Sequence, residues 1–162
     1  MPKVLIVYYS RSGNTEKMAR IVAEAIQEEG VSVACQRVAD TKVDDLLEAE
    51  GIVMGSPTYY GTMAAELKKL IDDSVQHHGK LDGKVGGAFS SSGCLGGGNE
   101  TTVLDLLHTL LIHGLIVQGD PFSAHYGAVS LGAPDDETSI TACRRLGQRV
   151  ARLVQRLRGC CP

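Results

Sequence analysis

Short apolar runs alternate with longer segments of helical periodicity along the whole chain. The apolar runs are rich in Val, Ile and other strand-favouring residues, and they predict strands at residues 3–9, 31–38, 51–56, 84–90 and 115–119. Elsewhere Leu, Val and Ile recur at three- and four-residue steps, which predicts helices at residues 14–29, 43–49, 62–76, 98–113 and 136–158. Strand and helix therefore alternate from one end of the sequence to the other.

The predicted strands are apolar at nearly every position rather than at every second one. Strands of this kind are buried on both faces, which indicates a parallel sheet covered by helices. Because crossovers between parallel strands are right-handed, the pattern predicts a doubly wound, three-layer α/β sandwich. We expect a single domain over residues 1–162. The longest irregular segment, 119–134, has a length at which loops are usually functional.

Composition and charge argue against several classes of function. A formal net charge of -3 lacks the basic excess of nucleic-acid-binding proteins, so no nucleic-acid partner is expected. No apolar stretch approaches the ~20 residues that cross a bilayer, and the first residues lack a signal-peptide cleavage region, so we expect a cytoplasmic protein without membrane attachment. Neither a metal site nor a disulfide framework is expected from the five irregularly spaced cysteines, Cys35, Cys94, Cys143, Cys160 and Cys161. The adjacent Cys160 and Cys161 are open to oxidation between molecules.

Three loops rich in Ser, Thr, Asn and Gly follow the first, third and fourth predicted strands. They are SRSGNT (10–15), SPTYYGT (56–62) and SSSGCLGGGNE (90–100). In an open parallel sheet, ligands bind outside the carboxyl ends of the strands, near the point where the strand order reverses. These three loops are therefore predicted to form one binding site.

The first loop is typical of a phosphate site that uses no cationic side chain. A helix N-terminus offers unpaired N–H groups and a partial positive charge. Gly13 lets the backbone turn and approach a ligand, and Ser10, Ser12, Asn14 and Thr15 add hydrogen-bond donors. The patterns GxxxxGK[ST] and GxGxxG are absent, which argues against nucleoside triphosphates and dinucleotides. The alternative is an ordinary helix N-cap preceded by a serine-rich turn.

The other two loops extend the predicted site beyond a phosphate. Tyr59 and Tyr60 offer flat faces on which an aromatic ring system can stack, although partial packing onto the next helix would also explain them. The glycine-rich third loop supplies N–H donors for a planar polar edge, or else serves as a flexible connector. An aromatic cofactor with a single phosphate fits all three loops, and FMN is such a cofactor.

These motifs resemble a known family over nearly the whole chain. The pattern S-x-S-G-N-T resembles the phosphate loop of flavodoxins. Residues 56–72, 90–114 and 125–132 resemble the flavodoxin-like NAD(P)H:quinone oxidoreductases of the tryptophan-repressor-binding-protein type. The resemblance implies a flavodoxin-like sandwich with a five-stranded parallel sheet of order 2-1-3-4-5 and helices on both faces. It also implies bound FMN, NAD(P)H as the electron donor and quinones as acceptors.

The resemblance further implies which residues contact the cofactor. They are Ser10, Arg11, Ser12, Gly13, Asn14, Thr15, Pro57, Thr58, Tyr59, Tyr60, Gly61, Ser90, Ser91, Ser92, Gly93, Cys94, Gly96, Gly97, Gly98, His113 and Tyr126. No catalytic side chain is expected, because flavin N5 carries the chemistry. His113 and Tyr126 are possible auxiliaries, the first also typical of a helix C-terminus and the second of loop packing. Cys94 is a small packing residue or a redox-sensitive thiol.

Two functions remain open. One is an FMN-dependent oxidoreductase that transfers two electrons from NAD(P)H to quinones or similar acceptors; the other is a small flavodoxin that carries electrons to a redox protein. Carriers surround the flavin with acidic side chains, which separate the two one-electron steps. Residues 56–62 and 90–99 contain none, which favours the enzyme. The chain also departs from the quinone reductases: it is shorter between the second and third strands and after the fifth, and it has no tryptophan.

A third possibility is an interaction module that binds no FMN, since a fold does not fix a function. The predicted site is shallow, and we expect a homo-oligomer, a dimer or a tetramer, to complete it.

Overall fold

The structure is a computed structural model that describes residues 3–159. Strands and helices alternate along these residues, as the hydrophobic pattern predicts. The elements in chain order are β1 (Lys3–Tyr8), α1 (Asn14–Glu28), β2 (Ser32–Arg37), η1 (Val38–Asp40), α2 (Asp45–Glu48), β3 (Gly51–Pro57), α3 (Ala65–Asp73), η2 (Ser74–His77), β4 (Val85–Ser92), α4 (Asn99–Ile112), β5 (Ile116–Val117), β6 (Ala128–Leu131) and α5 (Glu137–Gly159).

The strands form one parallel sheet in the order β2-β1-β3-β4-β5, which confirms the predicted order. A sixth strand, β6, was not predicted. It pairs with the same outer edge of β4 as β5 does: β5 lies beside Val85 and Gly86, and β6 lies beside residues 89–92. The fifth position of the sheet is thus shared by two short strands, because the chain leaves the edge after β5 and returns at β6.

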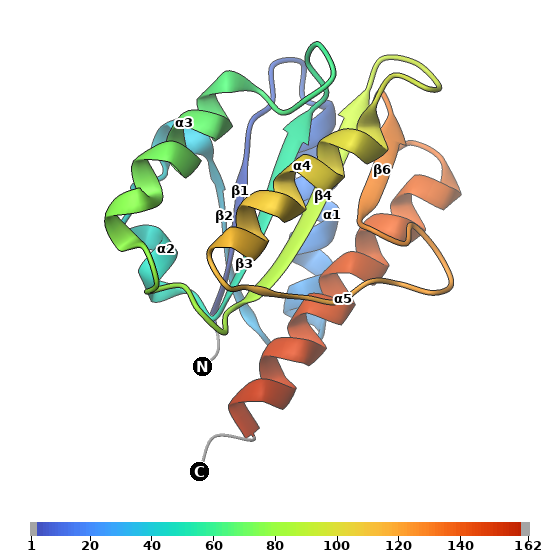
Figure 1. Cartoon of the computed structure of the whole chain (residues 1–162). Coiled ribbons are helices and arrows are strands. Elements are labelled where there is room, and N and C mark those ends of the chain that lie inside the picture. The colour runs from blue at the N-terminus through green and yellow to red at the C-terminus, as the bar shows by residue number, and fades with distance from the viewer. Residues whose placement is uncertain (1–2, 160–162) are drawn as a thin grey trace.

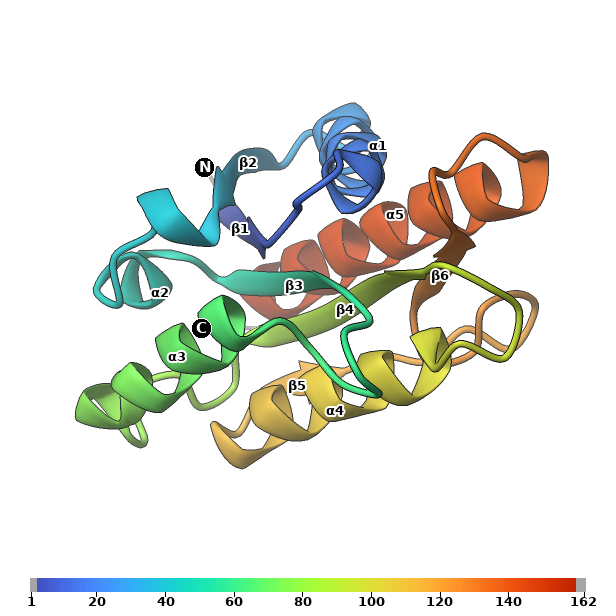
Figure 2. The ribbon, with the colours of Figure 1, turned by 90° about the horizontal axis from the view of Figure 1, so that it is seen from above.

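Helices cover both faces of the sheet, so the predicted three-layer sandwich is confirmed. Figure 2 shows α1 and α5 on one face and α3 and α4 on the other. The central strands β1, β3 and β4 are buried on both sides, and each face of the sheet has its own core. One core is built on α1 and α5, and the second on α2, α3 and α4.

Two glycines allow unusually close packing in the core on the α1 and α5 side. A Cβ atom at Gly147 of α5 would lie 2.5 Å from the carbonyl oxygen of Val22, so the glycine lets α5 lie directly on α1. A Cβ atom at Gly55 of β3 would lie within 2.8 Å of three ring carbons of Phe89, a fully buried side chain of β4. The outer end of the Phe89 ring therefore packs directly against the β3 backbone, two residues before Pro57, where β3 ends.

Several elements are shorter than the sequence predicts. The helix expected at 43–49 is the single turn α2, and the helix expected at 62–76 is α3 followed by a 3-10 turn. The strand expected at 115–119 is reduced to Ile116–Val117, and the N–H of Asp120 already donates to the carbonyl oxygen of His125 in the following segment. Within residues 3–159, no helix is long and apolar enough to cross a membrane.

Candidate functional site

The loops after β1, β3 and β4 gather at one end of the molecule, at the top of Figure 1. They enclose a hollow of about 180 Å³. The residues that line it are Ser10, Arg11, Ser12, Asn14, Thr15, Pro57, Thr58, Tyr59, Ser91, Ser92 and Gly93. The structure therefore brings the three predicted loops together, as the strand order requires.

The first loop ends in a helix N-terminus without a side-chain cap. The residue before α1 is Gly13, which has a left-handed backbone (φ 94°) that favours glycine. Its N–H donates to the hydroxyl oxygen of Ser10 at 3.1 Å, which closes the loop on itself. The space beside the Gly13 Cα is open, because a side-chain carbon added there would meet no atom within 4 Å. The first-turn amides of α1 thus face a cradle that can accept an anion.

Arg37, at the end of β2, fixes this loop through hydrogen bonds. One guanidinium nitrogen donates to the carbonyl oxygen of Ser10 at 3.0 Å, and another donates to the carboxylate of Glu16. Arg20 donates to the second oxygen of that carboxylate at 2.6 Å. The hydrogen bond from Arg20 and the charge of Arg37 lower the pKa of Glu16. No sequence motif marks Arg37, and sequence reasoning missed it.

The second loop is a tight turn that presents tyrosines. Tyr59 and Thr62 form an antiparallel bridge, and the two residues between them, Tyr60 and Gly61, both have positive φ (47° and 89°). This is the geometry of a type I′ turn, in which a tyrosine is strained. The ring of Tyr60 is fully exposed, whereas Tyr59 packs edge-on against Tyr9 with ring centroids 5.9 Å apart. Backbone strain of this kind concentrates at functional sites.

Three successive serines at the end of β4 tie the loops to one another. Because side chains alternate along a strand, Ser91 faces α1 and bonds with Thr15 (hydroxyl oxygens 3.0 Å apart), while Ser90 faces the other side and lies 3.3 Å from the hydroxyl of Thr58. The hydroxyl of Thr102, fully buried in α4, donates to Thr58 at 3.0 Å. These hydroxyls fix the loops through protein contacts, and Thr102 is a second residue that no motif marked.

The third loop is open and backbone-rich. Gly96 and Gly98 have positive φ (70° and 93°), and Gly98 precedes α4 in the same left-handed conformation as the residue that precedes α1. The side chain of Leu95 is 88% exposed, and Cys94 is exposed beside it. Asn99 donates from its amide nitrogen to the hydroxyl oxygen of Ser92 at 3.1 Å, which fixes the end of the loop.

The structure does not bring His113 into this cluster. His113 follows the last residue of α4, and the 14 residues of this helix correspond to ~21 Å of length between it and the third loop. Its Nε2 lies 2.8 Å from the hydroxyl oxygen of Ser74, and burial together with the neighbouring His78 lowers its pKa. The structure thus places His113 away from the three loops, because α4 carries it to the amino end of the sheet, and its contact with the flavin stays a prediction.

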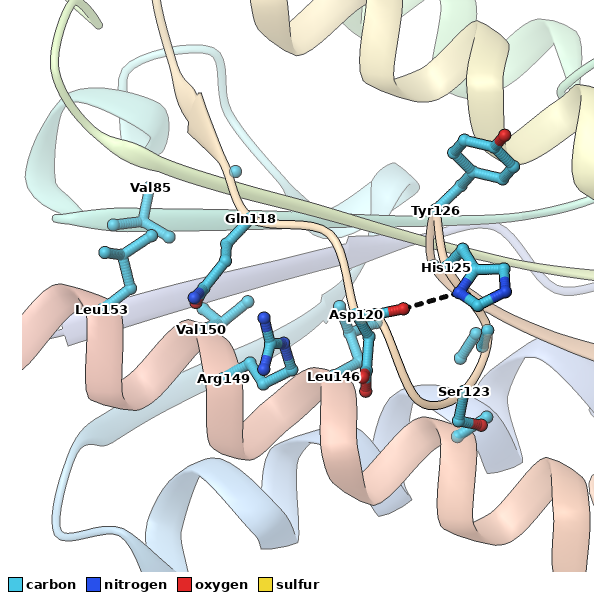
Figure 3. Close-up of a pocket in the computed structure, with 15 residues that line it drawn as sticks. Val85, Gln118, Asp120, Ser123, His125, Tyr126, Leu146, Arg149, Val150 and Leu153 are labelled. Atoms are coloured by element: carbon cyan, nitrogen blue, oxygen red, sulfur yellow. Dashed lines mark hydrogen bonds between the residues drawn. The ribbon is translucent and has the colours of Figure 1, made fainter.

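Tyr126 also lies away from the three loops. It precedes β6, whose first residue pairs with Phe89, so at least three strand positions (~10 Å) separate it from the loop after Ser92. Figure 3 shows Tyr126 at the end of the segment that crosses α5, with its ring directed away from that helix. The residue that does reach the loop cluster from this part of the chain is Gly132, whose N–H donates to the carbonyl oxygen of Ser92 at 2.8 Å.

Asp120 organises the segment that contains Tyr126. Its carboxylate accepts two hydrogen bonds from Arg145 (2.6 and 2.7 Å) and one from the N–H of Phe122, and its carbonyl oxygen lies 2.7 Å from Nδ1 of His125 (Figure 3). The bonds from Arg145 lower the pKa of Asp120 to about 2. The cavity beneath this segment has a volume of only about 20 Å³, enough for a water molecule but not for a cofactor.

The electrostatic character of the hollow is that of neutral donors. Among the described residues that line it, Arg11 is the one cation and none is acidic. Elsewhere in residues 3–159, no group of three or more His, Cys, Asp or Glu side chains is arranged to hold a metal ion. The described cysteines, Cys35, Cys94 and Cys143, are free thiols; Cys160 and Cys161 lie outside the described residues. The hollow thus offers hydrogen-bond donors to an anionic ligand without an opposing negative charge.

Comparison with known proteins places the chain in a family. Residues 5–111 match the model of the flavodoxin domain. A flavodoxin of Aquifex aeolicus is 43% identical over 95% of this chain and 88% of its own length. A protein of Sinorhizobium fredii named NAD(P)H dehydrogenase (quinone) is 34% identical over 97% of this chain and 99% of its own length. The chain belongs to the flavodoxin family.

Solved structures agree with this assignment. An archaeal flavodoxin superposes with a TM-score of 0.79 at 32% identity, covering 94% of this chain and 99% of its own. A WrbA-like flavodoxin of Agrobacterium tumefaciens superposes with a TM-score of 0.78 at 26% identity, covering 96% and 99%. The resemblance to the flavodoxin-like NAD(P)H:quinone oxidoreductases is confirmed by these relatives. The alignment with the Sinorhizobium protein spans 197 positions, more than the 162 residues here, so that relative carries insertions that this chain lacks.

Proposed function

We propose that the chain binds FMN between the three loops and uses it for the NAD(P)H-dependent, two-electron reduction of quinones or similar acceptors. The observation that carries this proposal is the convergence of an uncapped helix N-terminus, a hydroxyl-lined hollow and a tyrosine turn at one edge of the sheet. The names of the relatives support the cofactor and the class of reaction, and the absence of acidic residues from the lining of the hollow supports two-electron chemistry.

The residues present fit FMN. Gly13 leaves space for a phosphate against the first-turn amides of α1, and Ser12 and Asn14 place polar groups beside it. The hollow of about 180 Å³ is smaller than the ~300–1,000 Å³ of a complete ligand pocket, so it suits the phosphate and the sugar-like chain. The flat ring would lie at the rim, between Tyr59 and the glycine-rich third loop. FMN supplies the exchange of hydride and electrons; the chain binds, orients and tunes it.

Variants in the phosphate loop test the binding proposal. Ser12→Asp adds a negative charge to the cradle and is expected to weaken FMN binding by about tenfold or more, because like charges lie within a few ångströms. Riboflavin, which lacks the phosphate, should bind the variant and the parent protein alike. Gln76→Glu adds the same charge on η2 and is the matched control. Binding is measured by quenching of flavin fluorescence, and a parent protein that binds neither flavin refutes the proposal.

Electron stoichiometry tests the reaction. For the proposed enzyme, a redox titration of the FMN-loaded protein should show two one-electron potentials that lie close together or are inverted, because N–H donors stabilise the fully reduced anion. NADH or NADPH should then reduce a small benzoquinone catalytically. Well-separated potentials with a very low second step, and no turnover with either nicotinamide, would assign the chain to electron carriage instead.

The carrier is the second candidate, and two observations favour it. The flavodoxin of Aquifex aeolicus is 43% identical over 95% of this chain, and the chain lacks the insertions of the Sinorhizobium dehydrogenase. In that case the acceptor is a redox protein rather than a quinone. The redox titration above separates the two functions directly.

We also propose that copies of the chain associate through α3 and α4. A groove of about 570 Å³ lies between these helices, and the exposed apolar side chains of Val75 and Ile112 line it, with Leu111 exposed nearby. Lys68 and Asp72, on the same groove, form an ion pair at 2.5 Å, so two copies can meet there without like-charge repulsion. Apolar surface of this kind is typical of interfaces.

Sedimentation of the purified protein tests the association. Ile112→Asp should convert an oligomer to a monomer, whereas Leu95→Asp, which places the same charge on the exposed third loop, should leave the oligomer intact. A parent protein that sediments as a monomer at micromolar concentration refutes this proposal.

A further inference from the structure

Glu16 is placed where it would normally compete with a bound phosphate. It is the third residue of α1, and Gly13 is the residue before the helix. A glutamate at this position commonly folds back to accept the N–H of the residue that precedes the helix, as in a capping box. That fold-back would bring a carboxylate to the same N-terminal amides that the proposed phosphate uses.

Both oxygens of the Glu16 carboxylate are held elsewhere. Arg20, one turn further along α1, donates to one oxygen at 2.6 Å, and Arg37, at the end of β2, donates to the other. The side chain of Glu16 is only 17% exposed, so the two guanidinium groups enclose it. The N–H that a capping box would use, that of Gly13, donates to the hydroxyl oxygen of Ser10 instead. The anion cradle is thereby left free.

Arg37 also fixes the loop that forms the cradle. Its other guanidinium nitrogen donates to the carbonyl oxygen of Ser10 at 3.0 Å, and its guanidinium lies 5.8 Å from the ring centroid of Tyr8. One side chain therefore joins the end of β2, the start of the phosphate loop and the first turn of α1. Among residues 3–159 the one side-chain hydrogen bond found for Arg20 is that to Glu16, so the two arginines are not equivalent.

We infer that Arg37 is a positioning residue for phosphate binding: it holds the carboxylate of Glu16 out of the anion cradle and fixes the carbonyl group of Ser10. The ligand is a phosphate monoester that carries close to two negative charges at neutral pH. The inference rests on the proposed function, because the phosphate is that of FMN. Arg37 acts through Glu16 and Ser10 and does not itself contact the ligand.

Binding of FMN and of riboflavin to Arg37→Gln tests the inference. In this variant Arg20 alone holds Glu16, and the freed carboxylate oxygen should weaken FMN binding by about tenfold at low salt, while riboflavin binding changes by less than about twofold, because only FMN carries the phosphate. The loss of FMN affinity should shrink at 0.5 M salt. Arg152→Gln breaks a similar exposed ion pair, with Glu29 at the other end of α1, and should leave both affinities unchanged.

Removal of Glu16 provides the decisive rescue. Glu16→Ala removes the carboxylate that could fold back onto the N-terminal amides of α1. The double variant with Arg37→Gln should therefore bind FMN within about twofold of the parent protein. Arg37→Lys keeps the positive charge but cannot bond Glu16 and the carbonyl oxygen of Ser10 at the same time, so an intermediate loss of FMN affinity, about threefold, is expected. It serves as the test variant if Arg37→Gln does not fold.

Three results would overturn the inference. They are parent-like FMN affinity in the Arg37 variant, an equal loss for FMN and riboflavin, and no recovery in the double variant. In each of these the proposed function stands, because the parent protein still binds FMN. A parent protein that binds no FMN refutes the proposed function, and this inference with it.

Discussion

The contact between Gly55 and Phe89 predicts a large effect of adding one methyl group. In Gly55→Ala the new carbon would lie within 2.8 Å of three ring carbons of Phe89, whereas carbon atoms normally approach to ~3.5–4.0 Å. The nearest of these carbons would lie at 2.1 Å, so the ring or the strand must move by at least ~1.4 Å to restore a normal contact. The side chain of Phe89 is fully buried, so it cannot turn away into solvent. Overpacking of this kind costs about 1–3 kcal/mol of unfolding free energy.

The same substitution should also disturb the site. The carbonyl oxygen of Gly55 accepts the N–H of Tyr9 at 3.0 Å, immediately before the phosphate loop, and Ser56 follows it at the start of the tyrosine loop. A displaced β3 backbone therefore moves both loops. We expect weaker FMN binding in Gly55→Ala in addition to the loss of stability.

Urea unfolding with a double-mutant cycle measures the effect. Phe89→Leu removes the outer ring carbons, which should cost about 1–2 kcal/mol by itself. In that background Gly55→Ala should cost less than about 1 kcal/mol, because the clash is gone. Gly93→Ala, where the added carbon meets no atom within 4 Å, is the matched control and should change stability by less than ~0.5 kcal/mol. Additive effects of Gly55→Ala and Phe89→Leu, within ~0.5 kcal/mol, would refute the reasoning.

Two further predictions concern hydrogen bonds that fix the loops. Asp120→Asn should lower stability at pH 7 by about 1–2 kcal/mol, since the pKa of Asp120 is lowered from 3.8 to about 2 by Arg145 and part of this effect is screened by solvent. Because its folded-state pKa is lowered, the ionised Asp120 contributes its full stabilisation above pH ~4, and this stabilisation is lost as the pH falls towards 2. Urea unfolding should therefore show a smaller difference in unfolding free energy between the parent protein and the variant at pH 3 than at pH 7. An equal difference at both pH values contradicts this reasoning. Thr102→Val should cost about 1–2 kcal/mol and weaken FMN binding through Thr58. Thr101→Val removes only an exposed hydroxyl that donates to the carbonyl oxygen of Gly98 at 2.9 Å, and it should change stability by less than ~0.5 kcal/mol; an equal loss of stability in the two variants contradicts the role of Thr102.

The architecture followed from the sequence because its signals were local and strong. Runs such as residues 3–9 are apolar on both faces, and only a sheet covered on both sides can bury them. The strand β6 was missed because AVSL (128–131) is short and lies among Gly, Ser and Pro, where loop signals dominate. Its pairing with β4 is a long-range contact that periodicity does not reveal.

The site was predictable only in part. The three loops converge because the strand order places them together, which a general rule for parallel sheets anticipates. Arg37 and Thr102 were missed because their partners lie 27 and 44 positions away in the sequence, and neither residue belongs to a motif. His113 and Tyr126 were assigned by resemblance, and the length of α4 and the register of β6 place both of them away from the loops.

The division of the outermost position between β5 and β6 has a consequence for solubility during folding. A long, regular edge strand offers a row of free backbone groups to which another chain can add, and such additions lead to fibrous aggregates. Here that border consists of segments of two and four residues, with a ten-residue excursion between them. Neither segment is long enough to template a foreign strand. Redesigns that straighten the excursion into one continuous strand should therefore form more aggregate at high concentration.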